Sequence, residues 1–230
     1  MEHVELSISQ ILSKAWELSK KHGFVIAAVL FVVTLIYQVI CLSDFPAHEY
    51  MNAIQHDDPE LLLALYSGFL VKYIKLSLLC GILYALFFGG ILNIVLKLTK
   101  GEMHEFNLSG FKMPVQTYVN FILIGIIIGI FSTIGTIMCI IPGIYVYIRL
   151  SLAMIHVLEH PEDGLSETLK KSWNMTKGNF WNIFLLALLY VLFYYLGIFC
   201  CCIGAFFSMA LGSFMIVVTY LTLDSHKETI

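Results

Sequence analysis

Six apolar stretches, each about as long as a membrane-spanning helix, constrain this sequence more than any other feature. A helix needs about 20 mostly apolar residues to cross the hydrocarbon core of a bilayer. The stretches cover residues 24–42, 76–96, 118–140, 143–158, 180–199 and 203–223, and the fourth is short and interrupted by Arg149. The sequence therefore predicts an all-α, polytopic membrane protein with six transmembrane helices.

The amino-acid composition supports this class and excludes others. Hydrophobic residues make up 59% of the chain and charged residues 13%, whereas soluble domains carry about 45–50% apolar and about 25% charged residues. The net charge of −3 provides no basic field for nucleic acid. The sequence contains no Ser-His-Asp set, Walker loop, dinucleotide-binding glycine motif or CxxC pair. We therefore expect neither catalytic activity nor a cofactor.

Very short connections predict that the spans form three hairpins. The run Ile141-Pro142-Gly143 is expected to make a tight turn between the third and fourth spans. Three cysteines at positions 200–202 join the fifth and sixth spans. Within the third span, Gly125 and Gly129 form a face of small residues that permits close helix packing. We expect residues 1–230 to form a single membrane domain.

The distribution of basic residues predicts the orientation in the membrane. Lysines precede the first span, lie between the second and third and between the fourth and fifth, and occur in the C-terminal tail, whereas residues 43–67 contain acidic but no basic residues. Because cytoplasmic loops carry an excess of lysine and arginine, both termini are expected in the cytoplasm. Lys72 and Lys75 are exceptions at the outer end of the second span, where long side chains can reach the interface. The run that begins at Phe24 is too long for the core of a signal peptide, so we expect the first span to be retained.

Two amphipathic segments, residues 5–22 and 164–177, are expected to lie in the cytoplasmic headgroup layer. Residues 8–26 align with residues 165–183, which places Trp16 on Trp173 and Lys20 on Lys177. Either the segment is duplicated, or two interfacial helices have converged on one composition. Such helices suit contact with anionic headgroups, so the lipid bilayer and its anionic lipids are the expected partners.

One part of the chain resembles a known family. Its pattern consists of the Pro142-Gly143 turn, Arg149 on the next helix, and the segment Ser172-Trp173-x-x-Thr176-x-Gly178-Asn179 that enters the following span. This pattern is similar to that of a superfamily of uncharacterised bacterial multi-pass membrane proteins, related to the membrane domain attached to some glycerophosphodiester phosphodiesterases. The match covers residues 141–183, and elsewhere only hydropathy and the number of spans agree.

The resemblance implies a location in the bacterial cytoplasmic (inner) membrane. The family places catalysis in a separate soluble barrel, for which this chain has no room, so no phosphodiesterase activity is expected. The matched residues also have physical interpretations. Gly178 and Asn179 are expected to end the amphipathic helix, because both tolerate the left-handed conformation, and Trp173 is expected at interface height.

Arg149 is the only arginine of the chain, and a charge within a span is costly unless it has a partner. Two interpretations are open. Arg149 could contact an anion, a lipid headgroup or a substrate, or it could hold the bundle together through helix-end carbonyls and the hydroxyls of Ser132, Thr133 and Thr136. The sequence offers no carboxylate at a similar depth, and we favour the structural interpretation.

Two further patterns are weaker. His156, Glu159 and His160 match the H-x-x-E-H arrangement of some zinc proteases, but a third ligand lacks support, so we predict a polar helix end and no metal site. Lys72 and Lys75, together with Asn93 and Asn120, could line a polar pathway or bind a ligand, although they lie at different depths.

These observations lead to one functional expectation and one alternative. We expect an integral membrane protein without catalytic activity, with a membrane-organising or accessory role, and with a membrane protein or a second copy as a candidate partner. The alternative is a small-molecule or lipid transporter that uses a polar site around Arg149.

Overall fold

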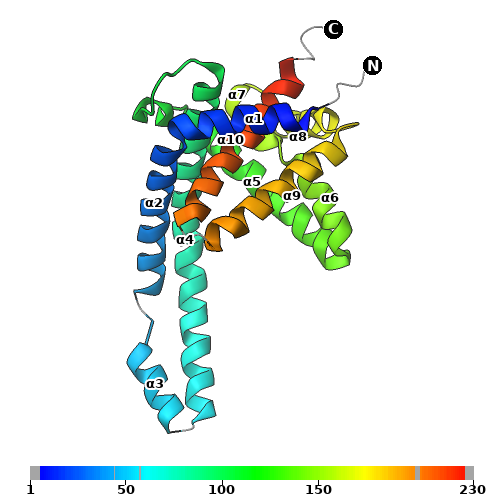
Figure 1. The fold of residues 1–230 in the computed structure, drawn as a ribbon. Coiled ribbons are helices and arrows are strands. Elements are labelled where there is room, and N and C mark those ends of the chain that lie inside the picture. The colour runs from blue at the N-terminus through cyan, green and yellow to red at the C-terminus, as the bar shows by residue number, and fades with distance from the viewer. Residues whose placement is uncertain (1–5, 44, 57, 200–202, 226–230) are drawn as a thin grey trace. The chain divides into compact units, whose positions relative to one another are not determined.

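The computed structural model describes residues 6–43, 45–56, 58–199 and 203–225, and every regular element in this part of the chain is helical. Two short elements are not α-helical: a π-helical turn, η1 (Ser19–Gly23), and a 3-10 turn, η2 (Leu108–Phe111). The α-helices (Figure 1) are α1 (Ile8–Leu18), α2 (Phe24–Leu42), α3 (Ala47–Gln55), α4 (Pro59–Lys100), α5 (Val115–Met138), α6 (Ile140–Leu150), α7 (Ala153–Glu159), α8 (Leu165–Met175), α9 (Phe180–Phe199) and α10 (Ile203–Ser225).

Within the described residues, six helical runs are long and apolar enough to cross a membrane, which confirms the predicted all-α, polytopic class. The fifth span, α9, begins and ends at the predicted residues 180 and 199. The fourth span differs, because α6 and α7 replace one continuous helix. The cysteine run at 200–202, predicted to form a tight turn, lies outside the described residues.

Contacts divide the chain into two compact units, whereas the sequence suggests one membrane domain. Unit 1 consists of Met1–Val29 and Phe87–Ile230, and unit 2 of Leu30–Leu86. Unit 2 contains α3 and parts of α2 and α4, and its internal contacts include the ring of Phe45 against that of Phe69, with centroids 5.0 Å apart. Arg149 and His156 belong to unit 1, and Lys72 belongs to unit 2.

Helix α4 is about twice as long as one span. Its 42 residues correspond to about 63 Å, compared with a hydrocarbon core of about 30 Å. The predicted loop at residues 43–67 is therefore largely helical, since it contains α3 and the first turns of α4. The early start has a local cause. The Asp58 carboxylate accepts a hydrogen bond from the Leu61 N–H at 3.0 Å, and Pro59 suits the first helical position.

The turn between α5 and α6 consists of Cys139 alone, in an extended conformation. The sequence places this turn at Ile141-Pro142-Gly143, and that placement is wrong because Pro142 and Gly143 lie in the first turn of α6. Proline is tolerated there, since the first N–H groups of a helix have no partner within it.

Close packing of α5 on α6 depends on two glycines. A Cβ atom on Gly135 would lie 2.8 Å from the Cα of Gly143, and a Cβ on Gly143 would clash with Thr136. The face of Gly125 and Gly129, which the sequence predicts to allow close helix packing, contributes little to such packing. A Cβ on Gly125 would make an ordinary contact with Met154 at 3.7 Å, and one on Gly129 would meet nothing within 4 Å.

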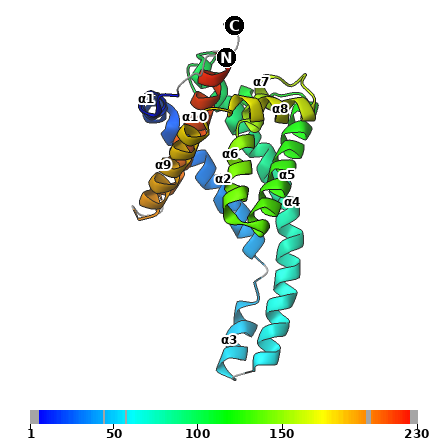
Figure 2. The same ribbon diagram turned by 90° about the vertical axis from the view of Figure 1, so that its right-hand side faces the viewer.

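In unit 1, each segment that precedes a hairpin packs on the exit helix of another hairpin. Helix α1 packs on α10, where Trp16 meets Phe207 edge-on with centroids 6.0 Å apart. Helix α8 packs on α6 and α7. The segment containing η2 packs on α4, because Asn93 donates a hydrogen bond to the Gly110 carbonyl at 2.7 Å. We call α1, residues 101–114 and α8 together the collar, which forms one end of unit 1 (Figure 2).

Helices α1 and α8 are equivalent in their bounds and in their burial. The alignment of residues 8–26 with 165–183 superposes the first and last residues of the two helices. Five positions are buried in both copies: Ile11 and Thr168, Ala15 and Ser172, Ser19 and Thr176, His22 and Asn179, Ile26 and Ile183. The segments are thus structural repeats.

The two copies differ where each helix ends. Gly178 follows α8 with φ of 91°, the left-handed conformation expected of it, and the chain is redirected before α9. Its counterpart in the first copy is Lys21, which lies in the π-helical turn η1 between α1 and α2. A left-handed φ costs glycine nothing but penalises lysine, so the first copy bends through a helical turn instead.

Candidate functional site

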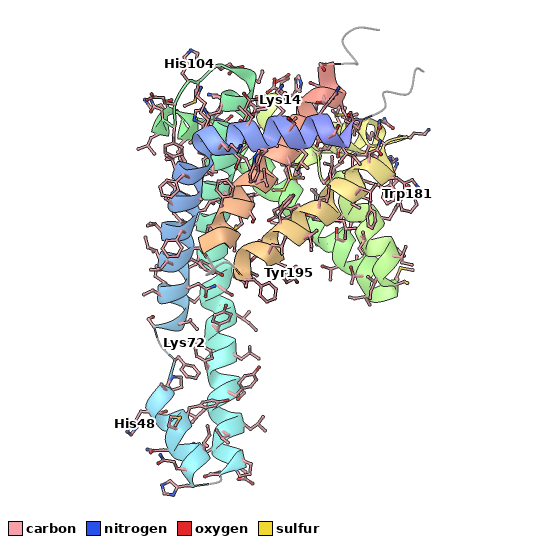
Figure 3. All side chains as sticks on the ribbon, viewed as in Figure 1. Lys14, His48, Lys72, His104, Trp181 and Tyr195 are labelled. Atoms are coloured by element: carbon pink, nitrogen blue, oxygen red, sulfur yellow. The ribbon has the colours of Figure 1, made fainter. Side chains whose placement is uncertain are left out.

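Two buried polar groups lie next to the collar and form the candidate site: Arg149 at the end of α6 and His156 on α7. Figure 3 shows Lys14 and His104 at the collar, and Trp181 and Tyr195 toward the two ends of α9. Trp181 is 71% exposed and lies in the first turn of α9, so it adds an aromatic ring to the surface near α8.

Arg149 is 5% exposed and faces aromatic rings. Its guanidinium carbon lies 4.5 Å from the centre of the Trp173 ring and 5.9 Å from that of Tyr145. Tyr145 in turn contacts Trp173, with centroids 5.9 Å apart, and Phe180, with centroids 5.0 Å apart. A guanidinium over aromatic faces is stabilised by the ring quadrupoles. Among the described residues, however, the guanidinium has no hydrogen bond and no ion pair, and its Nε is fully buried.

The backbone of Arg149 explains why the fourth span is broken. Its carbonyl accepts hydrogen bonds from the hydroxyls of Ser172 at 3.0 Å and Thr176 at 3.3 Å, both on or next to α8. In a continuous helix this carbonyl would accept from the N–H four residues later. Helix α6 instead ends at Leu150 and α7 begins at Ala153. The hydroxyls of α8 thus take over one backbone hydrogen bond of the span.

The expected hydroxyl partners of Arg149 do not contact it. Thr136 donates to the Ser132 carbonyl at 2.8 Å, and the Ser132 hydroxyl is buried without a hydrogen bond. Arg149 lies instead against Trp173 of α8, so its charge is held at the level of the collar. If the collar lies in the headgroup layer, the cost of this charge is much lower than at the centre of a bilayer.

His156 belongs to a series of four side chains that are linked by hydrogen bonds. Its Nδ1 lies 2.9 Å from the Tyr220 hydroxyl of α10, and its Nε2 lies 2.8 Å from Oδ2 of Asp163. Lys171 of α8 donates to the same Asp163 oxygen at 2.7 Å. His156 is 2% exposed and Tyr220 is fully buried. The series therefore links α10, α7, the α7–α8 connection and α8.

The residues of the H-x-x-E-H pattern are engaged with other side chains. Both ring nitrogens of His156 are engaged, and Glu159 accepts a hydrogen bond from Lys100 at 2.6 Å. His160 faces Glu162 and Asp224 at 3.3 and 3.8 Å. In the described part of the chain, no group of three potential metal ligands is gathered.

The ion pair between Asp163 and Lys171 shifts the pKa values of both side chains. The hydrogen bond from Lys171, and next that from His156, lowers the pKa of the Asp163 carboxyl. The same hydrogen bond raises the pKa of Lys171. Both groups are therefore held in their charged forms over a wide pH range, and the pair stabilises the join between α7 and α8.

The other predicted ligand residues belong to two different compact units. Lys72 and Lys75 lie on the part of α4 that belongs to unit 2, whereas Asn93 and Asn120 belong to unit 1. The Asn93 amide donates to the Gly110 carbonyl, and the Asn120 amide oxygen accepts from Gln116 at 3.0 Å. Both asparagines therefore have structural partners.

Unit 1 contains an apolar cavity of about 260 Å³ between α6, α9 and α10. Its serine and threonine hydroxyls are already used: Ser151, Ser213 and Thr219 donate to the nearby carbonyls of Ile148, Met209 and Met215. The remaining lining is mainly aliphatic and aromatic. Such a cavity suits a hydrocarbon group and offers little to a polar solute.

Sequence reasoning missed several of these residues. The Leu6 N–H donates to the Asn179 side chain, and the Asn182 amide donates to the Leu6 carbonyl, both at 3.2 Å. These two hydrogen bonds hold Leu6, just before α1, against the beginning of α9. Tyr220 and Asp163 carry no local motif. For Asp163 the spacing to Lys171 on an expected helix was the only signal available.

The chain was also compared with known proteins, and it matches no family model, no curated protein and no solved structure.

Proposed function

We propose that this protein is an integral membrane protein without catalytic activity, which organises the membrane or serves as an accessory subunit by engaging anionic lipid headgroups through its collar. In this proposal the collar and both termini face the cytoplasm of a bacterial cell, and the protein lies in the cytoplasmic membrane.

The exposed lysines of α1 and of the turn η1 are the observation that supports the proposal. The helix buries Ile11 and Ala15 against unit 1, but Lys14, Lys20 and Lys21 are exposed. None of the three lysines has an ion pair among the described residues, although Lys20 lies 5.6 Å from the ring centre of Trp16. Trp16 is 41% exposed. Exposed lysines beside a half-exposed tryptophan suit contact with anionic headgroups.

The polar side chains beneath the collar favour a structural over a catalytic role. His156 uses both ring nitrogens in bonds within the protein, and Glu159 pairs with Lys100. A general base or nucleophile needs a free, accessible atom. His156 offers no free ring nitrogen in this arrangement.

Lipid dependence of thermal stability tests the proposal. Wild type and a Lys14→Gln/Lys20→Gln/Lys21→Gln variant are reconstituted in nanodiscs of zwitterionic lipid with and without anionic lipid. Anionic lipid is expected to raise the Tm of wild type by several degrees more than that of the variant, whereas a Lys75→Gln control behaves as wild type. Equal responses of wild type and the triple variant, or saturable flux of a substrate into liposomes, would contradict it.

A second candidate function is transport of a lipid or small molecule. The buried guanidinium of Arg149, which has no hydrogen bond among the described residues, favours it. The serine and threonine hydroxyls around the apolar cavity donate to backbone carbonyls, which disfavours a polar path. Unchanged ligand binding and uptake in an Arg149→Ala variant would remove the main support for transport.

A further inference from the structure

We propose that Arg149 is the centre of a binding site for a phosphate oxyanion, with Trp173 and Tyr145 as its aromatic frame. The phosphate comes from a phospholipid headgroup or from free phosphate. The inference rests on the proposed function, since it names the chemical group that one part of the collar would hold.

The first argument is the hydrogen-bonding demand of the guanidinium. An arginine side chain carries five N–H donors and no acceptor. Arg149 is 5% exposed, and its Nε donor is buried without an acceptor among the described residues. Burial of charged donors without acceptors is costly. An acceptor from outside the chain would remove this cost.

The second argument is that nearby carboxylates are committed elsewhere. Asp163 is bound by Lys171 and His156, Glu159 is bound by Lys100, and Glu167 lies 3.6 Å from Lys171. On α8 and just after it, Lys170 and Lys177 are exposed and have no ion pair among the described residues. Helix α8 and the residues just after it therefore carry two exposed positive charges, at Lys170 and Lys177, that no carboxylate among the described residues pairs with.

The third argument is geometry. The Trp173 ring lies 4.5 Å from the guanidinium carbon, so the ring covers one side of the cation. A guanidinium held in this way presents its N–H groups along an edge, which matches two oxygens of one phosphate. Trp173 and Tyr145 are 37% and 41% exposed, so the frame reaches the surface.

Fluorescence of Trp173 provides the test. A Trp16→Phe/Trp181→Phe variant leaves Trp173 as the only tryptophan. It is titrated, in a neutral detergent, with a short-chain phosphatidylglycerol, with inorganic phosphate, and with a diacylglycerol of the same chain length. A saturable change with a phosphate-bearing ligand and none with diacylglycerol is expected. A response to the phospholipid alone identifies the headgroup as the source, and a response to inorganic phosphate identifies free phosphate.

Two substitutions in the same background assign the response to Arg149. Arg149→Gln is expected to weaken binding about tenfold or more, the loss typical of a charged hydrogen-bonding group. Arg149→Lys is expected to be intermediate, because an ammonium cannot make the bidentate contact. If the glutamine variant does not fold, the lysine variant carries the comparison. Lys75→Gln, on the part of α4 that belongs to unit 2, serves as the control and should bind as the background variant does.

Either of two results would overturn the proposal: an equal response to diacylglycerol, or unchanged phosphate binding in both Arg149 variants. The proposed function fails separately. If the variant that replaces the three lysines of α1 and η1 responds to anionic lipid as wild type does, the collar proposal falls, while the Arg149 titration stands on its own result.

Discussion

The Tyr220 hydroxyl of α10 and Nδ1 of His156 on α7 lie 2.9 Å apart, deep in unit 1. The other ring nitrogen of His156 binds Asp163, which in turn binds Lys171 of α8. The second and third hairpins are therefore joined by a continuous series of side-chain hydrogen bonds next to the collar. Because His156 is buried, loss of the Tyr220 hydroxyl or of the Asp163 carboxylate leaves one of its ring nitrogens without a partner in this series.

Removal of the Tyr220 hydroxyl tests this join. Tyr220→Phe leaves Nδ1 of His156 buried without a partner, which is expected to cost about 1–3 kcal/mol of stability. Tyr195→Phe is the matched control. Tyr195 is 58% exposed, so removal of its hydroxyl leaves no buried group without a partner. The Tm of both variants in detergent checks the prediction, and equal Tm values would contradict it.

The Asp163–Lys171 pair predicts a dependence of stability on pH. Since the pKa of Asp163 is lowered in the folded protein, chiefly by Lys171, its stabilising contribution is present above the ordinary carboxyl value of about 3.9 and is lost as the pH falls through the lower folded value. Asp163→Asn should therefore lower the Tm at pH 7, and the difference from wild type should shrink below about pH 4. Glu162→Gln, at an exposed carboxylate, should not show this trend. A difference that stays constant from pH 7 to pH 3 would exclude the pair as its cause.

The contact between α5 and α6 predicts opposite outcomes at two glycines. Gly143→Ala places a methyl group against Thr136 and is expected to cost about 1–3 kcal/mol, as overpacking does. Gly129→Ala meets nothing within 4 Å and replaces glycine inside a helix, so it should be neutral or slightly stabilising. Denaturation of both variants in the same detergent checks the pair. Equal destabilisation would place the close contact elsewhere.

The sequence was most informative where long-range contacts matter least. Hydropathy predicted both the first and the last residue of α9. The alignment of residues 8–26 with 165–183 predicted two equivalent helices. The start of α4 was missed although Asp58 and Pro59 signal it locally, because apolar length alone was used to place the span. The turn at Cys139 was missed because proline and glycine also suit the first turn of a helix.

The candidate site depends on contacts that sequence patterns do not record. His156 and Tyr220 are separated by 64 positions, and no local spacing relates them. Arg149 stood out as a lone charge, but its position against Trp173 depends on how α8 packs on α6. The break after Leu150 likewise arises from the hydroxyls of Ser172 and Thr176.

The proposed orientation predicts which loops are accessible from each side of the membrane. A reporter fused at Glu162, in the α7–α8 connection, should be active in the cytoplasm, and one fused at Pro59, at the start of α4, should be active outside it. The reason is the positive-inside bias of the loops. The opposite pair of activities would reverse the orientation, and activity on the same side would contradict the number of spans between them.

The depth of Trp173 in the bilayer tests the central claim, that the collar lies at headgroup level with Arg149 beneath it. The Trp16→Phe/Trp181→Phe variant is reconstituted with phospholipids brominated at different positions along their acyl chains, and quenching of Trp173 is measured. The account predicts the strongest quenching by bromine nearest the headgroup and a steady decrease toward the chain ends. Strongest quenching by bromine at the chain ends, or no quenching by any brominated lipid, would contradict it.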